Sequence, residues 1–95
     1  MIGLDTHVRL ARKVRLRRDP QSNKMMLLYP ERGLALSDSA ADVAALCDGR
    51  TAGAIAVELC ARHAGAARGQ VEHDVLTFLR SLAERGLLAG DEEAP

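Results

Sequence analysis

The sequence predicts a small α+β domain in which a three-stranded antiparallel sheet is followed by a cluster of three helices. The first third of the chain alternates apolar and polar residues with the period of two that strands show, and the rest repeats apolar residues at helical spacing. Only a few residues separate the expected strands, which favours an antiparallel meander. A length of 95 residues suits one domain, since two cores would each be too small to be stable.

The strands are expected between residue 8 and residue 36. The first is expected as one continuous strand with four apolar residues on even positions and arginines between them: Val8, Leu10, Val14 and Leu16. Residues 19–23 have the composition of a turn, and residues 25–28 form the second strand, which Pro30 ends. Leu34 and Leu36 then share one face of a short third strand.

Three helices are expected to follow. Ser39 is the expected N-cap of the first helix, Asp48-Gly49 its end, and Thr51 the N-cap of the second. The third helix shows the clearest spacing of apolar residues, at Val71, Val75, Phe78, Leu79 and Leu82.

Gly86 and Leu87 are expected to end the third helix in a Schellman motif. We expect a single winged-helix-like domain over residues 1–95, with its core in residues 8–88 and a frayed acidic tail at 90–95.

Composition excludes several classes of function. The 13 basic residues are balanced by 13 acidic ones, so no basic excess favours nucleic acid as a partner, and two aromatic residues are too few for a base-stacking platform. The apolar runs are far shorter than the roughly 20 residues of a membrane span. Residues 1–16 show no signal peptide pattern, so we expect a cytoplasmic protein without a membrane partner.

Charge is nevertheless distributed unevenly along the chain. Residues 1–24 hold seven bases against two acids, whereas residues 70–95 hold six acids against two bases. This pattern is typical of two oppositely charged solvated faces. It also fits a bipolar surface that orients a partner.

The residues that could carry chemistry do not form a convincing set. Cys47, Cys60 and His63 contain one pair at metal-ligand spacing, Cys60-x-x-His63, but all three lie on apolar stripes that predict buried thiols and a partly buried imidazole. No nucleophile, base and orienting group can be assigned together, and no phosphate-binding glycine motif is present. We therefore expect no catalytic residue, no metal and no cofactor.

The third strand is the feature that suggests a function. It is the last strand of a meander, so its outer N–H and C=O groups are unpaired unless another element covers them. Such an edge is a template for an incoming peptide strand.

An ordered set of residues resembles the PqqD family, the small coenzyme PQQ (pyrroloquinoline quinone) synthesis D proteins. The resemblance spans roughly residues 12–88. It is carried by Leu27-Leu28-Tyr29-Pro30-Glu31, Gly33, Leu36, Ser39-Ala40, Leu46-Cys47-Asp48-Gly49, Thr51, Asp74-Val75, Phe78-Leu79 and Gly86-Leu87.

The resemblance implies a peptide chaperone of pyrroloquinoline quinone biosynthesis that is not an enzyme. Such a protein would bind the precursor peptide PqqA and present it to the radical S-adenosylmethionine enzyme PqqE. In the family fold, the peptide adds as a strand beside the third strand and packs along the third helix. The binding residues implied here are Arg32, Gly33, Leu34, Ala35, Leu36, Val71, Asp74, Val75, Phe78 and Leu82.

Two other functions remain open at this point. A DNA-binding winged helix has a similar layout, although Glu72, Asp74 and Glu84 on the expected recognition helix would repel a duplex. A structural dimerisation module would pair two copies through the same open edge as a homodimer.

Overall fold

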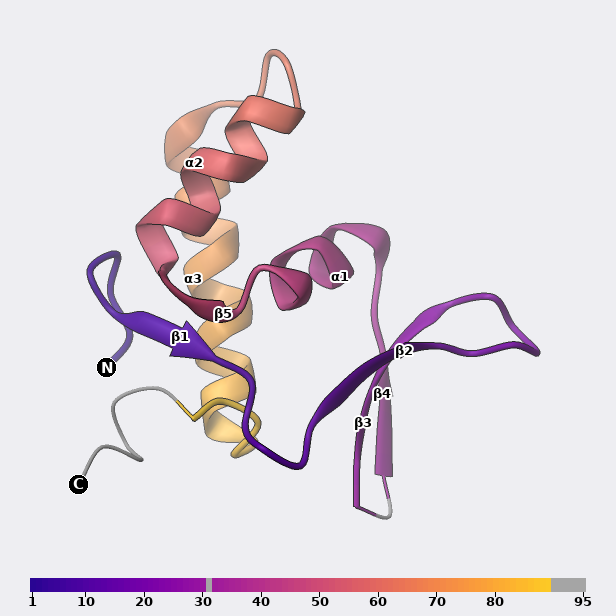
Figure 1. The fold of residues 1–95 in the computed structure, drawn as a ribbon. Coiled ribbons are helices and arrows are strands. Elements are labelled where there is room, and N and C mark those ends of the chain that lie inside the picture. Colours follow the sequence, from indigo (N-terminus) through magenta and orange to yellow (C-terminus); the bar gives the residue numbers. More distant parts are fainter. Residues whose placement is uncertain (31, 90–95) are drawn as a thin grey trace.

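The computed structural model describes residues 1–30 and 32–89 and shows two small antiparallel sheets with three helices (Figure 1). The molecule is flat, with extents of 37 × 36 × 17 Å. The three-stranded sheet lies at one end, α2 and α3 lie at the other, and α1 lies between them. The acidic tail expected at 90–95 lies outside the described residues. In the described part of the chain, no helix combines the length and the apolar character needed to cross a membrane.

The predicted antiparallel meander is confirmed. Strands β2 (Arg15–Arg18), β3 (Met25–Tyr29) and β4 (Arg32–Ala35) form one sheet in the order β2-β3-β4. In the turn between β2 and β3, the Asp19 carboxylate accepts hydrogen bonds from the Ser22 hydroxyl at 2.8 Å and the Gln21 N–H at 3.1 Å. This turn brings β3 back beside β2.

The prediction of one continuous first strand is wrong. The chain forms β1 (His7–Arg9), turns where the Val14 N–H donates to the Ala11 carbonyl at 2.9 Å, and only then enters β2. Val8 and Val14 are both buried, as the alternation predicted. The period of two thus identified the buried side chains but not the turn between two strands of different sheets.

Residues 48–51, expected as a helix stop followed by a cap, form an additional strand. Strand β5 (Asp48–Thr51) pairs with β1 in a separate two-stranded sheet, so the described residues contain five strands rather than the expected three. The Arg50 guanidinium holds the Asp48 carboxylate through bonds of 2.9 and 2.8 Å and lowers the pKa of that carboxyl to about 2.

Helix α1 (Asp38–Ala45) begins two residues earlier than expected. Ser37 rather than Ser39 is its N-cap, because Ser37 has extended backbone and its hydroxyl accepts the Ala40 N–H at 3.2 Å. Thr51 caps α2 (Ala52–Arg62) as predicted, accepting the Ala54 N–H at 3.0 Å.

Ala67 is the N-cap of helix α3 (Arg68–Glu84) and makes no capping side-chain bond. The predicted Schellman motif ends the helix. The Leu87 N–H donates to the Leu82 carbonyl at 2.9 Å, the Gly86 N–H donates to the Ala83 carbonyl at 3.0 Å, and Gly86 has a φ of +74°.

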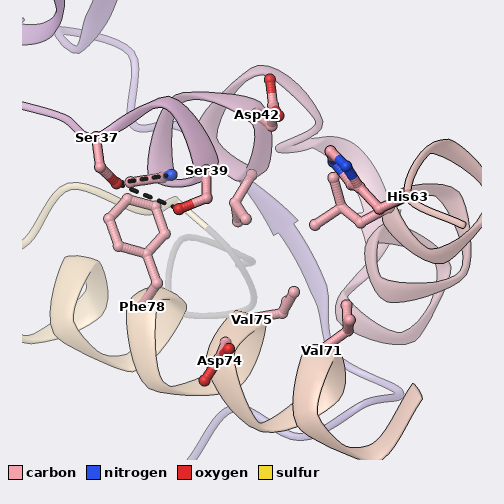
Figure 2. Close-up of a pocket in the computed structure, with 11 residues that line it drawn as sticks. Ser37, Ser39, Asp42, His63, Val71, Asp74, Val75 and Phe78 are labelled. Atoms are coloured by element: carbon pink, nitrogen blue, oxygen red, sulfur yellow. Dashed lines mark hydrogen bonds between the residues drawn. The ribbon is translucent and has the colours of Figure 1, made fainter. Parts of the chain in front are cut away.

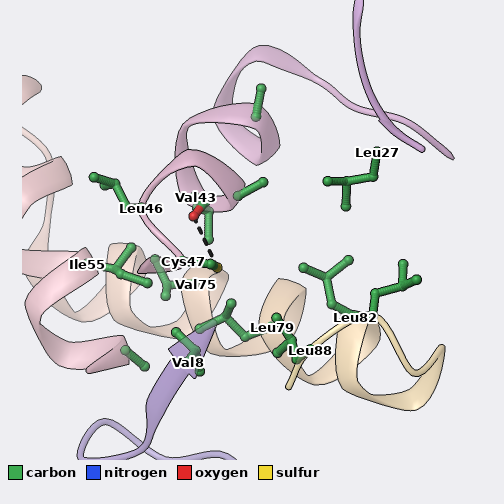
Figure 3. Close-up of a cluster of buried hydrophobic side chains, with 14 of the residues drawn as sticks. Val8, Leu27, Val43, Leu46, Cys47, Ile55, Val75, Leu79, Leu82 and Leu88 are labelled. Atoms are coloured by element: carbon green, nitrogen blue, oxygen red, sulfur yellow. Dashed lines mark hydrogen bonds between the residues drawn. The ribbon is translucent and has the colours of Figure 1, made fainter. Parts of the chain in front are cut away.

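One core joins these elements (Figure 3). Its fully buried large side chains come from both sheets and from α2 and α3: Val8, Leu27, Ile55, Val75, Leu79 and Leu82. After α3 the chain returns beside β1, where the Ala11 N–H donates to Leu87 and the Ala89 N–H donates to Arg9. The core therefore fixes α3 relative to β1 and α1, and this positions the surface described next.

Candidate functional site

Strand β4 is an edge of the meander, with β3 as its strand neighbour in the described chain. The Leu36 N–H donates to the Met25 carbonyl at 2.9 Å, immediately beyond the end of β4. In an antiparallel pair, successive residues point their N–H and C=O groups alternately toward the partner and away from it. Leu34 therefore faces β3, whereas Gly33 and Ala35 point their backbone groups to the open side.

The side chains along this edge leave it accessible. Gly33 and Ala35 are exposed and small, so neither shields the backbone groups that point outward. Leu34 is half-buried and Leu36 is buried, which holds the strand against the core. The edge is thus firmly seated on one side and free on the other.

A pocket of about 340 Å³ lies beyond the end of β4, between the three helices (Figure 2). Its walls come from Ser37 and α1, from the end of α2, and from α3 between Val71 and Phe78. The lining residues are Ser37, Ser39, Ala40, Asp42, Val43, Leu59, His63, Val71, Asp74, Val75 and Phe78.

The pocket has an apolar floor and a polar rim. Val43 and Val75 are buried, and in Figure 2 the Phe78 ring points toward the Ser37 and Ser39 hydroxyls. Asp74 is exposed at the rim.

The rim also carries Asp42 and His63, and the Asp74 carboxylate accepts a bond from Gln70 at 2.9 Å. Such a pocket suits an apolar side chain whose backbone stays at the surface.

The structure brings most of the residues implied by the resemblance to this surface. Arg32 to Ala35 form β4, and four of the five helix residues line the pocket: Val71, Asp74, Val75 and Phe78. Leu82 is 0% exposed and belongs to the core rather than to the pocket lining.

Sequence reasoning missed the walls from α1 and α2. The helical spacing of the first helix marked Val43 as apolar, but it did not show that α1 faces α3. His63 was expected to be a partly buried imidazole, with a metal ligand as the alternative. The structure instead leaves it exposed at the end of α2, where it lines the pocket.

The cysteines have the environment of packing residues. Burial raises the pKa of the Cys47 thiol to about 12, and this thiol donates to the Val43 carbonyl at 3.3 Å. Cys60 is a free, half-buried thiol. Among the residues that the structure describes, no three His, Cys, Asp or Glu side chains converge as a metal site would require.

Comparison with known proteins identifies related sequences and folds. The family model described as coenzyme PQQ synthesis protein D (PqqD) matches residues 24–88. A PqqA binding protein of Rhodopseudomonas palustris strain HaA2 is 34% identical over 84 residues, which are 88% of this chain and 82% of that protein.

A second relative is longer. The bifunctional coenzyme PQQ synthesis protein C/D of Methylorubrum extorquens is 39% identical over 80 residues, which are 84% of this chain but 22% of that protein.

Two solved structures share the fold. The solution structure of the PqqD part of Methylobacterium extorquens PqqCD is described as a functional, stand-alone recognition element for ribosomally synthesised and post-translationally modified peptides. It superposes with a TM-score of 0.77 at 40% identity and covers 93% of this chain and 94% of that one. TbiB1, solved with the TbiA(beta) leader peptide, has a TM-score of 0.71 at 24% identity over 84% of this chain and 93% of that one, and supports the fold alone.

Proposed function

The chain belongs to the PqqD family of coenzyme PQQ synthesis D proteins, and from this premise we propose that it is a peptide chaperone that binds the precursor peptide PqqA. The observation that carries the proposal is the open edge of β4, which ends at an apolar pocket. Relatives named PqqA binding proteins supply the identity of the peptide.

In the proposed complex, the peptide adds a strand to the meander beside β4. The backbone groups that Gly33 and Ala35 point outward would bond the peptide backbone, which gives affinity that depends little on sequence. A strand advances about 3.3 Å per residue, so a peptide a few residues long also reaches the pocket beyond β4. An apolar side chain placed there would select the peptide and its register.

The same proposal includes a role without catalysis. The chain would hold PqqA and present it to PqqE, while the chemistry stays on the enzyme. Burial of the Cys47 thiol supports this, because a neutral thiol inside the core is a poor nucleophile. A cytoplasmic location, expected from the sequence, agrees with a ligand that is made by ribosomes.

Substituting Ala35 by proline tests the edge directly. The proline ring removes the N–H that faces the open side and crowds an incoming strand, while the bonds from β4 to β3 stay intact. Loss of one hydrogen bond is worth roughly 0.5–1.5 kcal/mol, so with the crowding we expect an affinity loss of about tenfold or more. Calorimetric titration with PqqA peptide measures the affinity, and a thermal melt of the same sample measures the fold.

Arg18→Pro is the matched control. The Asp19 N–H donates to the Lys24 carbonyl at 2.8 Å, so the neighbouring Arg18 N–H faces the open side of β2, at the opposite edge of the sheet. This variant should bind PqqA as the wild type does. Unchanged affinity and melting temperature in Ala35→Pro would exclude β4 as the binding edge. A dimer that dissociates on adding peptide would instead show that two copies share this edge.

A further inference from the structure

The meander has a second face that points away from the core. We call it the outer face. It is formed by the side chains of Arg15, Arg17, Met26, Leu28 and Ala35 and by the backbone of Gly33. Cross-strand pairing arranges them in two rows, one through Leu28 and one through Met26. The opposite side chains of β3, from Met25, Leu27 and Tyr29, pack into or against the core.

The centre of the outer face is apolar. Leu28 is 41% exposed. The Met26 and Leu28 side chains extend over Gly33, where an added Cβ would lie 3.1 Å from the Met26 Cε and 3.2 Å from a Leu28 Cδ. Exposed Ala35 continues this surface to the edge of β4. An apolar patch bordered by polar groups is typical of a protein interaction site.

The border of this patch on β2 is cationic. Arg15 and Arg17 are both exposed, as are their neighbours Arg12 and Lys13. One Arg15 nitrogen donates to the Arg12 carbonyl at 2.7 Å, which holds that guanidinium at the start of the strand. The ion pairs found in the described part of the chain use Arg50, Arg62 and Arg68 instead. None of the carboxylates that the structure describes therefore forms an ion pair with the arginines of this border.

We propose that the outer face docks the enzyme that modifies the bound peptide, through an enzyme surface on which carboxylates flank an apolar side chain. The inference rests on the proposed function and adds the surface through which the enzyme binds. Complementary charge would orient the enzyme toward the Arg15 and Arg17 border, and the apolar centre would supply contact area.

The outer face is continuous with the proposed peptide site. A peptide strand beside β4 extends the sheet, so every second peptide side chain falls on the outer face, next to Gly33 and Ala35. The remaining peptide side chains face the core side, toward the pocket. An enzyme on the outer face would touch the chaperone and the peptide together, while the pocket still holds the peptide.

The test uses the full chain, PqqA peptide and PqqE. The variant is Arg17→Glu with Leu28→Thr, which reverses one border charge and removes the exposed apolar side chain while keeping residues suited to a strand. The matched control is Arg85→Glu with Val57→Thr. It reverses the charge of the exposed Arg85, the C-cap of α3, and replaces an apolar side chain of α2 that is 48% exposed. Surface plasmon resonance measures PqqE affinity, and calorimetry measures PqqA affinity separately.

We expect the outer-face variant to bind PqqE about tenfold or more weakly, and to bind PqqA within about twofold of the wild type. The control should match the wild type in both. Raising salt from about 50 to about 500 mM should weaken PqqE binding by the wild type more than by the variant.

Several results would overturn the inference. Unchanged PqqE affinity in a folded variant would exclude the outer face as the docking surface. Wild-type protein that binds PqqA but not PqqE would exclude it as well. Equal losses for PqqE and PqqA would make this face part of the peptide site. A variant that alone shifts from dimer to monomer in sedimentation would assign the face to a second copy. Wild-type protein that does not bind PqqA would refute the proposed function itself.

Discussion

Gly49 lies in β5 beneath the Arg9 guanidinium, with a φ of +108°. That angle lies beyond the left-handed helical region, near +57°, that other residues reach at moderate cost. A Cβ at this position would also lie 2.5 Å from an Arg9 nitrogen, so the guanidinium would have to move. The residue thus permits the pairing of β5 with β1.

We expect Gly49→Ala to lower the free energy of unfolding by about 2 kcal/mol or more. Gly86→Ala is the matched comparison, because Gly86 also has a positive φ, of +74°, but an added Cβ would meet nothing within 4 Å. There we expect a loss of about 1 kcal/mol. Urea denaturation followed by circular dichroism measures both values. Equal losses would mean that the backbone at Gly49 relaxes on substitution.

Helix α3 supplies four of the residues that line the pocket, yet its N-terminus is weakly stabilised. Ala67 makes no side-chain capping bond, and the first turn contains no acidic residue. The first backbone N–H groups of a helix carry partial positive charge and favour an acceptor or an anion nearby.

Ala67→Asp should therefore stabilise the domain. Ala67 has the extended backbone of an N-cap, with φ −76° and ψ 121°, so an aspartate there can accept an N–H of the first turn. The expected gain is about 1 kcal/mol, or roughly 4–8 °C in melting temperature. Thr51→Ala, which deletes the cap of α2, should produce a loss of similar size. A melting temperature that does not rise would show that solvent already satisfies this helix end.

The pocket wall on α3 gives an independent test of peptide binding. Val71→Asp places a carboxylate in the apolar lining, which should lower PqqA affinity by about tenfold. Because residue 71 lies in the first turns of α3, the helix dipole should stabilise the new carboxylate by about 0.3–1 kcal/mol. This gain should compensate for part of the packing energy that the valine side chain supplied.

Thr77→Asp is the control for the pocket test, since Thr77 is exposed on the same helix and does not line the pocket. Peptide titration and a thermal melt of both variants give the comparison. Equal affinity in the two variants would place the peptide away from the pocket.

At the scale of the whole molecule, the sheet end and the helical end differ in the charged residues that they carry. The stretch that contains β2 carries exposed Arg12, Lys13, Arg15, Arg17 and Arg18, while α3 at the other end carries Glu72, Asp74 and Glu84 beside Arg68 and Arg80. The formal net charge is zero. A helix that reads a major groove needs cations where α3 carries acids.

We therefore expect no sequence-selective DNA binding, in contrast to the winged-helix alternative. At physiological salt, any binding should be non-specific and no tighter than about 10⁻⁶ M. A gel shift with a pool of random duplexes measures this, with PqqA binding by the same preparation as the control for activity. Enrichment of one duplex sequence would favour the DNA-binding function over the peptide chaperone.

Local signals in the sequence determined much of the fold. Alternation and short turns predicted the meander, Thr51 predicted the cap of α2, and Gly86-Leu87 predicted the end of α3. Each of these features depends on residues that are neighbours in the chain, so the local sequence is sufficient to predict it. The period of α3 likewise marked Val71, Val75 and Phe78, which line the pocket.

Tertiary structure decided the features that depend on distant partners. The chain turns between β1 and β2 because β1 pairs with β5, about 40 residues away, and no local pattern marks β5 as a strand. Ser37 and His63 line the same pocket only because core packing brings α1 and the end of α2 against α3. Spacing along one element shows which side of it is buried. Which element covers that side depends on how all the buried faces fit together, and that arrangement created the pocket.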